Sequence, residues 1–213
     1  MDAKTLFSLR TASVVGLLCI AVSGQARDRF SFEGFLGGAL NAGTTLTISQ
    51  AGYPDLDHPA DYETRALELP LYYSLRFAIH DGSGRWEAQF THHKVYLSNR
   101  TPEIQSFEIS HGLNLMTFGR AWTSLPVDVR AAAGMVIAHA DSEIREQPFS
   151  PGYRLTGPSF LLGFGKRLGL TRWLFASGEV QFSAARVKVP VSGGVASAPN
   201  VALHMMFGLG ARF

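Results

Sequence analysis

The last thirteen residues of the chain alternate between two kinds of side chain. From Val201 to Phe213, every second residue is apolar, whereas the positions between them include His204, Arg212 and two glycines. Successive side chains of a β-strand point to opposite faces of the sheet. This run is also longer than the ~5–6 residues of an ordinary soluble strand. The pattern therefore predicts one long strand with an apolar face and a more polar face.

The same period-two alternation recurs in seven segments upstream. Glycine, proline and polar residues separate these segments, which is typical of strands joined by turns. With the terminal strand they come to about eight. The upstream segments are 30–40, 67–77, 86–93, 107–115, 127–137, 159–165 and 175–183.

The lengths of the connections between these segments alternate along the chain. Three are short (80–84, 119–125 and 166–171), and they alternate with connections that are long or modest in length. Outer-membrane barrels have short periplasmic turns and longer outward loops. A soluble sandwich has no reason to show this alternation. The long and modest outward connections are 41–64, 98–102, 140–156 and 190–200.

The terminal strand closing on Phe213 resembles the carboxyl-terminal signature of bacterial outer-membrane barrels. The resemblance covers the chain from about residue 30 to 213. It implies an all-β fold, an eight-stranded antiparallel up-and-down transmembrane β-barrel of the OmpA-like and OmpX-like class, because single-chain bacterial barrels have an even number of strands. It also implies that Phe213 is the signal read by the barrel-assembly machinery during insertion.

A soluble lipocalin-like barrel or a sandwich is the alternative, because alternation alone does not exclude it. Strand length, loop parity and Phe213 favour the membrane barrel. The partners expected are outer-membrane lipids and lipopolysaccharide, and the barrel is expected to be a monomer. The formal net charge is +2 and the basic residues do not cluster in the sequence, which argues against nucleic-acid binding.

Residues 1–26 are typical of a cleaved signal peptide, which leaves 27–213 as the barrel. Lys4 and Arg10 precede a short apolar stretch, and Gly24 and Ala26 form a small-x-small cleavage site. An uncleaved anchor helix is the alternative, although the stretch is short for a membrane span. The sole cysteine, Cys19, lies in this segment, so no disulfide is expected in the mature barrel.

The polar face of the strands is expected to fill the barrel interior. An eight-stranded barrel is just wide enough for side chains, and buried charges must be paired. We therefore expect an interior plugged by an ion-pair network rather than an open pore. The members are Glu33, Glu68, Arg76, Glu87, His93, Glu108, Asp128, Arg130, Arg167, Glu179, His204 and Arg212. Pairing 86–93 with 107–115 about a turn near Asn99 places His93 opposite Glu108.

Two histidines fall on the lipid-facing side of this register, where polar groups are costly. His92 and His111 are therefore weak candidates for a site on the outer wall. A β-bulge at His111, or contact with lipid head groups, would explain them equally well. His92-His93 is not a chelating spacing on a strand, and no metal or cofactor is expected.

An enzyme is the less favoured interpretation. Lipid A deacylase barrels carry His-x-Ser on one strand, which this chain lacks: Ser110 and His111 are adjacent and point to opposite faces. His139 and Ser142 could meet only through a turn. No catalytic residue is therefore assigned. The leading expectation is a structural or loop-presenting barrel.

Two other functions stay open. One is a lipid A acyl hydrolase that uses His92, His111 or His139. The other is a narrow conduit for small hydrophobic molecules, which requires an interior gap beside four glycines of the terminal half. These glycines are Gly163, Gly165, Gly208 and Gly210.

Overall fold

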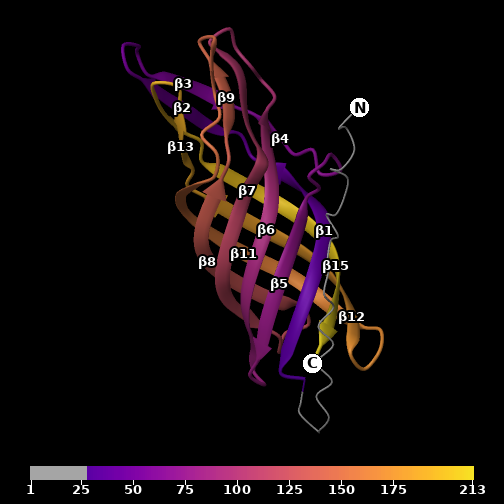
Figure 1. Cartoon of the computed structure of the whole chain (residues 1–213). Helices are drawn as coiled ribbons and strands as arrows, with labels where there is room; N and C mark the ends of the chain where they lie inside the picture. Colours follow the sequence, from indigo (N-terminus) through magenta and orange to yellow (C-terminus); the bar gives the residue numbers. More distant parts are fainter. Residues whose placement is uncertain (1–27) are drawn as a thin grey trace, which may run out of the picture.

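The structure is a computed structural model that describes residues 28–213. The predicted signal peptide, with Cys19, lies outside the described residues. Between residues 28 and 213 there is no helix that is long and apolar enough to cross a membrane. The described chain is organised entirely by strands (Figure 1).

Eight long strands form a closed antiparallel ring in the order β1-β5-β6-β7-β8-β11-β12-β15. Each strand pairs with its neighbours among the long strands along the chain, and β1 pairs with β15 from Ser31↔Arg212 to Asn41↔Ala202. The predicted eight-stranded up-and-down barrel is therefore confirmed. The strands are β1 (Phe30–Asn41), β5 (Tyr73–His80), β6 (Gly84–Leu97), β7 (Ile104–Trp122), β8 (Asp128–Ala138), β11 (Arg154–Gly169), β12 (Leu174–Ala185) and β15 (Asn200–Arg212).

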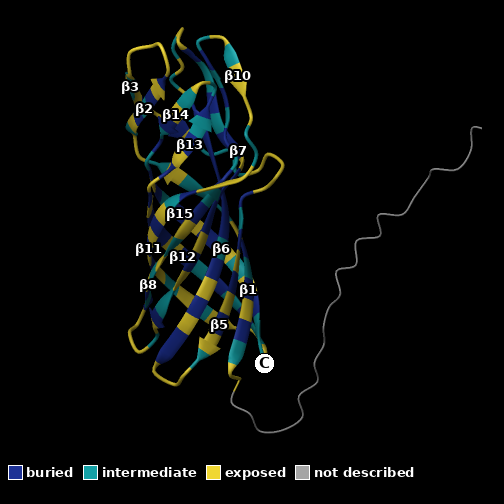
Figure 2. Cartoon of the chain, turned by 60° about the vertical axis from the view of Figure 1, so that its left-hand side comes forward, coloured by how far each residue is buried: buried dark blue, intermediate teal, exposed yellow. Residues whose placement is uncertain are grey.

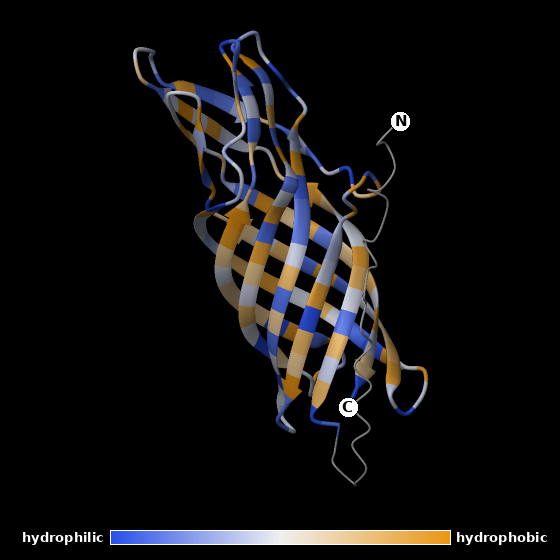
Figure 3. Cartoon of the chain, in the orientation of Figure 1, coloured by the Kyte–Doolittle hydropathy of each residue, from blue (hydrophilic) through white to orange (hydrophobic). Residues whose placement is uncertain are grey.

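The barrel wall is apolar on its outside, and Figure 3 shows hydrophobic and hydrophilic positions alternating along the long strands. Large hydrophobic side chains stand exposed on every strand of the ring; Phe207 is 74% exposed and Phe160 is 62% exposed. Trp86, Trp122 and Trp173 lie beside the three short turns. An apolar band bordered by aromatic residues is the surface of a barrel solvated by lipid. Because outer-membrane barrels have short turns on their periplasmic side, we name this end of the ring the periplasmic end.

The long connections fold into further strands at the opposite end of the ring (Figure 1). Four of them make a separate antiparallel sheet in the order β13-β14-β2-β3. Others extend the ring, since β4 pairs with β6, and β9 pairs with both β7 and β10. Their bounds are β2 (Thr44–Gln50), β3 (Leu56–Ala60), β4 (Tyr62–Glu63), β9 (Asp141–Ile144), β10 (Gln147–Phe149), β13 (Lys188–Val191) and β14 (Gly194–Ser197).

We call these seven strands, with the outer ends of β6 and β7, the cap. The cap encloses a hydrophobic core that contains Ile48, Phe107 and Val189, each 2% exposed or less. This core continues into the outer part of the ring through Leu113 and Val136. Figure 2 shows buried positions running from the long strands into the cap. The outward connections are thus folded structure with a core of their own.

Two expectations about strands are wrong. The alternation in 67–77 is strand only from Tyr73, because the preceding residues form an exposed loop in which Leu67 is 90% exposed. His93 lies opposite Leu113, not Glu108. A bulge between His93 and Val95 inserts extra residues of β7 and shifts the register, which a turn-centred count does not foresee.

Candidate functional site

The interior of the membrane-spanning part is filled by a network of charged side chains. Arg130 bridges Glu87 and Glu179, while Arg76 bonds Glu179 at 2.8 Å and Gln89 at 2.8 and 3.0 Å. Four arginines face four carboxylates, so the cluster is neutral overall. The members are Arg76, Arg85, Arg130 and Arg167 with Glu33, Glu87, Asp128 and Glu179.

The carboxylates of this network have partners from several strands. Glu33 accepts hydrogen bonds from Arg167 and from Ser177 Oγ at 2.7 Å, and its carboxylate lies 3.5 Å from Arg76. Asp128 accepts from Arg85 at 2.9 Å near the periplasmic end. Buried charge is tolerated only when it is paired and hydrogen-bonded in this way. The network therefore ties six of the eight strands together across the interior.

Glycines make the room that the network occupies. A Cβ at Gly163 would lie 2.6 Å from Arg130 Cγ and 2.8 Å from Glu179 Oε1. A Cβ at Gly165 would lie 2.9 Å from Glu179 Cγ, and one at Gly208 would lie 2.5 Å from Phe35. A Cβ at Gly210 would lie 2.6 Å from Glu33 Cγ. The interior gap that the conduit hypothesis requires beside these four glycines is filled.

A neutral hydrogen-bonded layer separates the charged network from the apolar core. His204 bonds Tyr72 Oη at 2.8 Å through Nδ1 and Ser183 Oγ at 2.7 Å through Nε2. His93 Nε2 lies 2.9 Å from Asn41 Oδ1 and its ring packs edge-on against His204. Both histidines are buried among polar partners. From the periplasmic end outward, the interior is therefore charged, then neutral and polar, then apolar.

Two residues expected inside lie elsewhere. Glu68 sits in the exposed loop before β5, where its side chain is 62% exposed. Glu108 lies on the outer end of β7 between the buried Phe107 and Ile109, so it points to the other face. Glu68 misled because its apparent strand is a loop, and Glu108 because the inward face of β7 is apolar at this level, with Phe107 and Ile109 in the core. The others line the interior or, in the case of Arg212, its periplasmic mouth.

Sequence reasoning missed one network member, Arg85, which bonds both Glu87 and Asp128. Arg85 lies two residues before Glu87 and therefore on the same face of β6, but the predicted segment begins at residue 86, just after it. At the same end, Arg120 bonds Asp81 in the turn before β6 and holds the pKa of that carboxyl well below its usual range. This pairing holds the guanidinium of Arg120 beside the turn, at the end of the membrane-spanning part.

The outer wall is interrupted where β7 bulges. Ser110, His111 and Gly112 lie between the pairs Val95↔Ile109 and His93↔Leu113. Gly112 has φ +125°, a backbone conformation that L side chains rarely adopt. The neighbouring strand is interrupted at the same level, because β8 ends at Ala138 and β9 begins at Asp141. Both interruptions fall where the barrel wall meets the cap.

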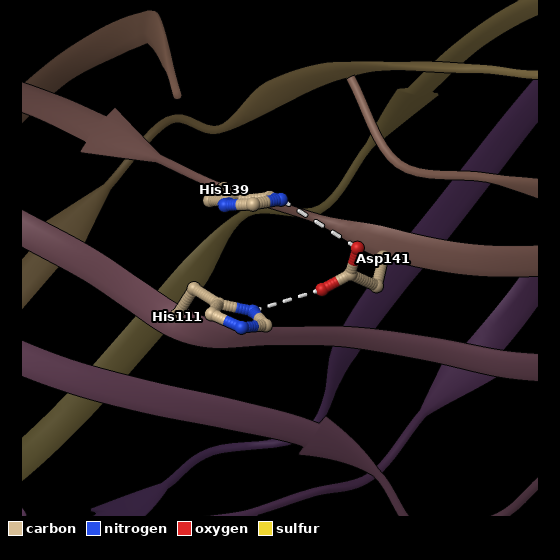
Figure 4. Close-up of side chains that lie close together, drawn as sticks. All are labelled: His111, His139 and Asp141. Atoms are coloured by element: carbon tan, nitrogen blue, oxygen red, sulfur yellow. Dashed lines mark hydrogen bonds and ion pairs between the residues drawn. The ribbon is translucent and has the colours of Figure 1, made fainter. Parts of the chain in front are cut away.

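These interruptions bring two histidines and an aspartate together (Figure 4). His111 Nδ1 lies 3.0 Å from Asp141 Oδ2, and His139 Nε2 lies 3.6 Å from Asp141 Oδ1. The two imidazole rings stack with centroids 4.6 Å apart. One ligand atom from each residue lies within 4.8 Å of the others, and no other such group of three occurs among residues 28–213.

Hydroxyl groups surround this cluster without forming a catalytic relay. Ser110 Oγ approaches His111 Nδ1 at 3.4 Å, the same nitrogen that faces Asp141. Ser150 Oγ lies 3.1 Å from His139 Nε2, again on the aspartate side. A serine hydrolase triad needs the acid and the hydroxyl on opposite nitrogens of one imidazole. In this arrangement the acid and the hydroxyl share one nitrogen of each imidazole.

His92, the other weak candidate, is covered rather than open to lipid. Its Nδ1 lies 2.8 Å from Asn114 Oδ1, and Tyr73 stacks on the ring at 5.2 Å. It is 5% exposed. Neighbours on the wall shield the ring from the hydrocarbon, although its Nε2 is buried without a hydrogen-bond partner in the described part of the chain. Asp141 was missed, although His139-x-Asp141 places two potential ligands two residues apart.

A closed eight-stranded ring with an apolar outer band and a charged interior defines a small transmembrane β-barrel of the bacterial outer-membrane class. The outer-membrane location predicted from the strand pattern follows from the same architecture. The arrangement of the strands thus identifies a barrel that is surrounded by lipid and contains a buried charged network.

No protein-family model matches the sequence, and a search of curated proteins gave no match. Several solved structures are similar. The Ail attachment invasion locus protein of Yersinia pestis is 14% identical, with 88% of this chain and 100% of that chain covered and a TM-score of 0.46. The outer membrane protein OprG of Pseudomonas aeruginosa is 12% identical, with 86% and 95% covered and a TM-score of 0.48. Neisserial surface protein A is 11% identical, with 88% and 98% covered and a TM-score of 0.41.

Proposed function

We propose that this protein is a closed, non-conducting barrel whose role in the envelope is carried by the cap that it holds above the membrane. The observation that carries this proposal is the filling of the interior between an open mouth lined by Arg85, Asp128 and Arg212 and the apolar core of the cap. An ion entering from the periplasm meets a cluster of four arginines and four carboxylates joined by ion pairs. An ion entering from outside meets an apolar core, where an unpaired charge is strongly unfavourable.

The cap suits the presentation of a fixed surface. Its four-stranded sheet buries Leu46, Ile48 and Ala196 on one face and displays Thr45, Ser49 and other short side chains on the opposite face. A surface held by a core and a hydrogen-bonded sheet loses little conformational entropy when a partner binds. The cap is therefore better suited to interaction than a set of flexible loops would be.

Conductance measurements test the closed interior. Purified protein inserted into planar phospholipid bilayers is expected to give no ion-current steps in salt solution, whereas a general porin in the same membrane gives them. Swelling of proteoliposomes in small sugars supplies a second readout. Regular conductance steps from well-folded wild-type protein would overturn the closed-barrel proposal and revive the conduit.

Surface labelling tests the orientation of the cap. Asp55→Cys in the cap is expected to react with a membrane-impermeant maleimide on intact cells. Arg172→Cys, in a short turn at the other end, is expected to react only after permeabilisation. Both positions are exposed. The reverse pattern would place the cap in the periplasm and refute its presentation to the exterior.

Charge placed on the displayed face tests where the role lies. Cells with the wild-type protein, cells without it, and cells carrying Thr45→Lys/Ser49→Lys/Val195→Lys are compared for detergent sensitivity and for attachment to surfaces. These three side chains point away from the cap core, so the barrel and cap are expected to fold. The variant is expected to behave like cells without the protein. If it behaves like the wild type, the role does not depend on this face.

A further inference from the structure

We propose that His111, His139 and Asp141 form a binding site for a divalent transition-metal ion of the zinc class at the junction of the barrel and the cap. The three residues come from the bulge in β7, from the break between β8 and β9, and from the first residue of β9. The site is separate from the interior network and from the displayed face of the cap.

The ligand atoms converge on one point. The carboxylate of Asp141 turns one oxygen toward His111 Nδ1 at 3.0 Å and the other toward His139 Nε2 at 3.6 Å (Figure 4). Ligand atoms around a tetrahedral zinc ion lie about 3.3 Å apart, given bonds of about 2.0–2.1 Å. The present spread of 4.8 Å needs to close by rotation of side chains. His111 is 57% exposed at its side chain and has room to do so.

The donor set selects the metal. Two imidazole nitrogens and one carboxylate oxygen match zinc, copper and nickel, whereas calcium and magnesium prefer oxygen ligands alone. The three residues would leave a fourth ligand to water, which could reach the cluster because the His111 side chain is exposed.

The backbone holds the site in place. Tyr153 donates a hydrogen bond to the carbonyl of His111 at 2.7 Å, and its ring packs edge-on against His139. His139 N–H bonds the carbonyl of Gly112 at 3.3 Å, which connects the bulge to the β8–β9 break. Supporting contacts of this kind orient metal ligands. A metal ion here would add a link between the barrel strand β7 and the cap strand β9.

The test uses the full mature barrel, refolded in detergent micelles without a polyhistidine tag. Titration with zinc chloride in a calorimeter, and with cobalt chloride followed by its visible absorption, is expected to give one site per chain. His111→Ala and His139→Ala are each expected to weaken binding at least about tenfold. His58→Ala is the matched control, because His58 bonds Asn99 in the cap and lies outside the cluster.

A second readout separates binding from folding. Zinc is expected to slow proteolysis of the wild-type cap and to leave the rate in His111→Ala/His139→Ala unchanged, while heat-modifiable gel migration shows that both barrels are folded. Calcium chloride is expected to have no such effect. The proposal is refuted if wild-type protein binds no zinc beyond the double variant, or if His58→Ala loses binding to the same extent.

Discussion

The transmembrane barrel and the cap are built with opposite polarity along the same strands. In the membrane part of β7, Met116 and Phe118 face outward and Thr117 faces the interior. In the outer end of β7, Phe107 and Ile109 are buried inside, while their neighbours on the other face are polar. Along the inward face the change lies between Leu115, which belongs to the apolar core, and Thr117.

This difference shows that the surrounding solvent decides which face of a strand is apolar. Lipid accepts apolar side chains outside and leaves the small interior to polar groups that must satisfy one another. Outside the membrane the strands face water, so the apolar side chains are buried inside and the polar ones lie on the surface. The charged network and the cap core are therefore two solutions to filling one continuous tube, and each can be tested separately.

Arg130→Met is expected to produce the largest effect, because it leaves Glu87 and Glu179 buried without this partner. Removing one member of a buried ion pair costs about 3–5 kcal/mol. Urea unfolding from phospholipid vesicles, followed by tryptophan fluorescence, measures the free energy of unfolding. Arg65→Met is the control, since its pair with Glu63 is exposed and is expected to contribute below ~1 kcal/mol. Equal stability of both variants would mean that the network adds no net stability.

Ile48→Ala is expected to destabilise the cap by about 2–5 kcal/mol, because it opens a cavity in the apolar core. Hydrogen exchange and limited proteolysis are expected to report faster opening of the cap, while heat-modifiable migration of the barrel stays unchanged. Val195→Ala, on the exposed face of the same sheet, is expected to change little. Simultaneous loss of barrel and cap would show that the two regions unfold as one unit.

Gly163→Ala is expected to cost about 1–3 kcal/mol by overpacking, because its Cβ would meet Arg130 and Glu179. Gly169→Ala in the same strand is the matched control, since no atom lies within 4 Å of its added Cβ. The same urea titration measures both. If Gly163→Ala is as stable as Gly169→Ala, the charged interior is less tightly packed than the apolar cap.

Tyr62→Phe is expected to have the smallest effect at neutral pH. Burial in the cap raises the pKa of Tyr62 from 10.0 to about 12. Above pH 10 the unfolded tyrosine ionises while the folded one stays neutral, so wild-type cap stability is expected to decline between about pH 10 and 12. Hydrogen exchange of the cap across this range is expected to show less decline in the variant. An identical decline in both proteins would mean that other groups cause it.

Much of the barrel could be predicted because its signal is local. Glu33, Arg76, Glu87 and Glu179 were placed inside by parity alone, and the structure joins them in one network. Period-two alternation needs no knowledge of the partner strand. Glu68 was misplaced because the strand begins only at Tyr73. Glu108 was misplaced because the apolar face of β7 turns inward in the cap, so that its polar face lies outside.

The His111, His139 and Asp141 cluster could not be assembled from the sequence. His111 was noticed because a polar residue falls on an apolar face, and His139 because Ser142 follows it closely in the sequence. Their proximity requires a register shift in β7 and a break between β8 and β9 at the same level. Such irregularities depend on how the cap strands pair with the barrel, which residue spacing does not encode.

The sequence by itself determined a closed, lipid-facing barrel of eight strands, since alternation, strand length and loop parity are properties of neighbouring residues. Only the tertiary structure decided that the outward loops fold into a cap, that the interior changes from charged to apolar, and that three distant side chains meet on the wall. The physical reason is that these features arise from contacts between segments far apart in the chain. Their energies depend on packing and on solvent, and not on the local pattern.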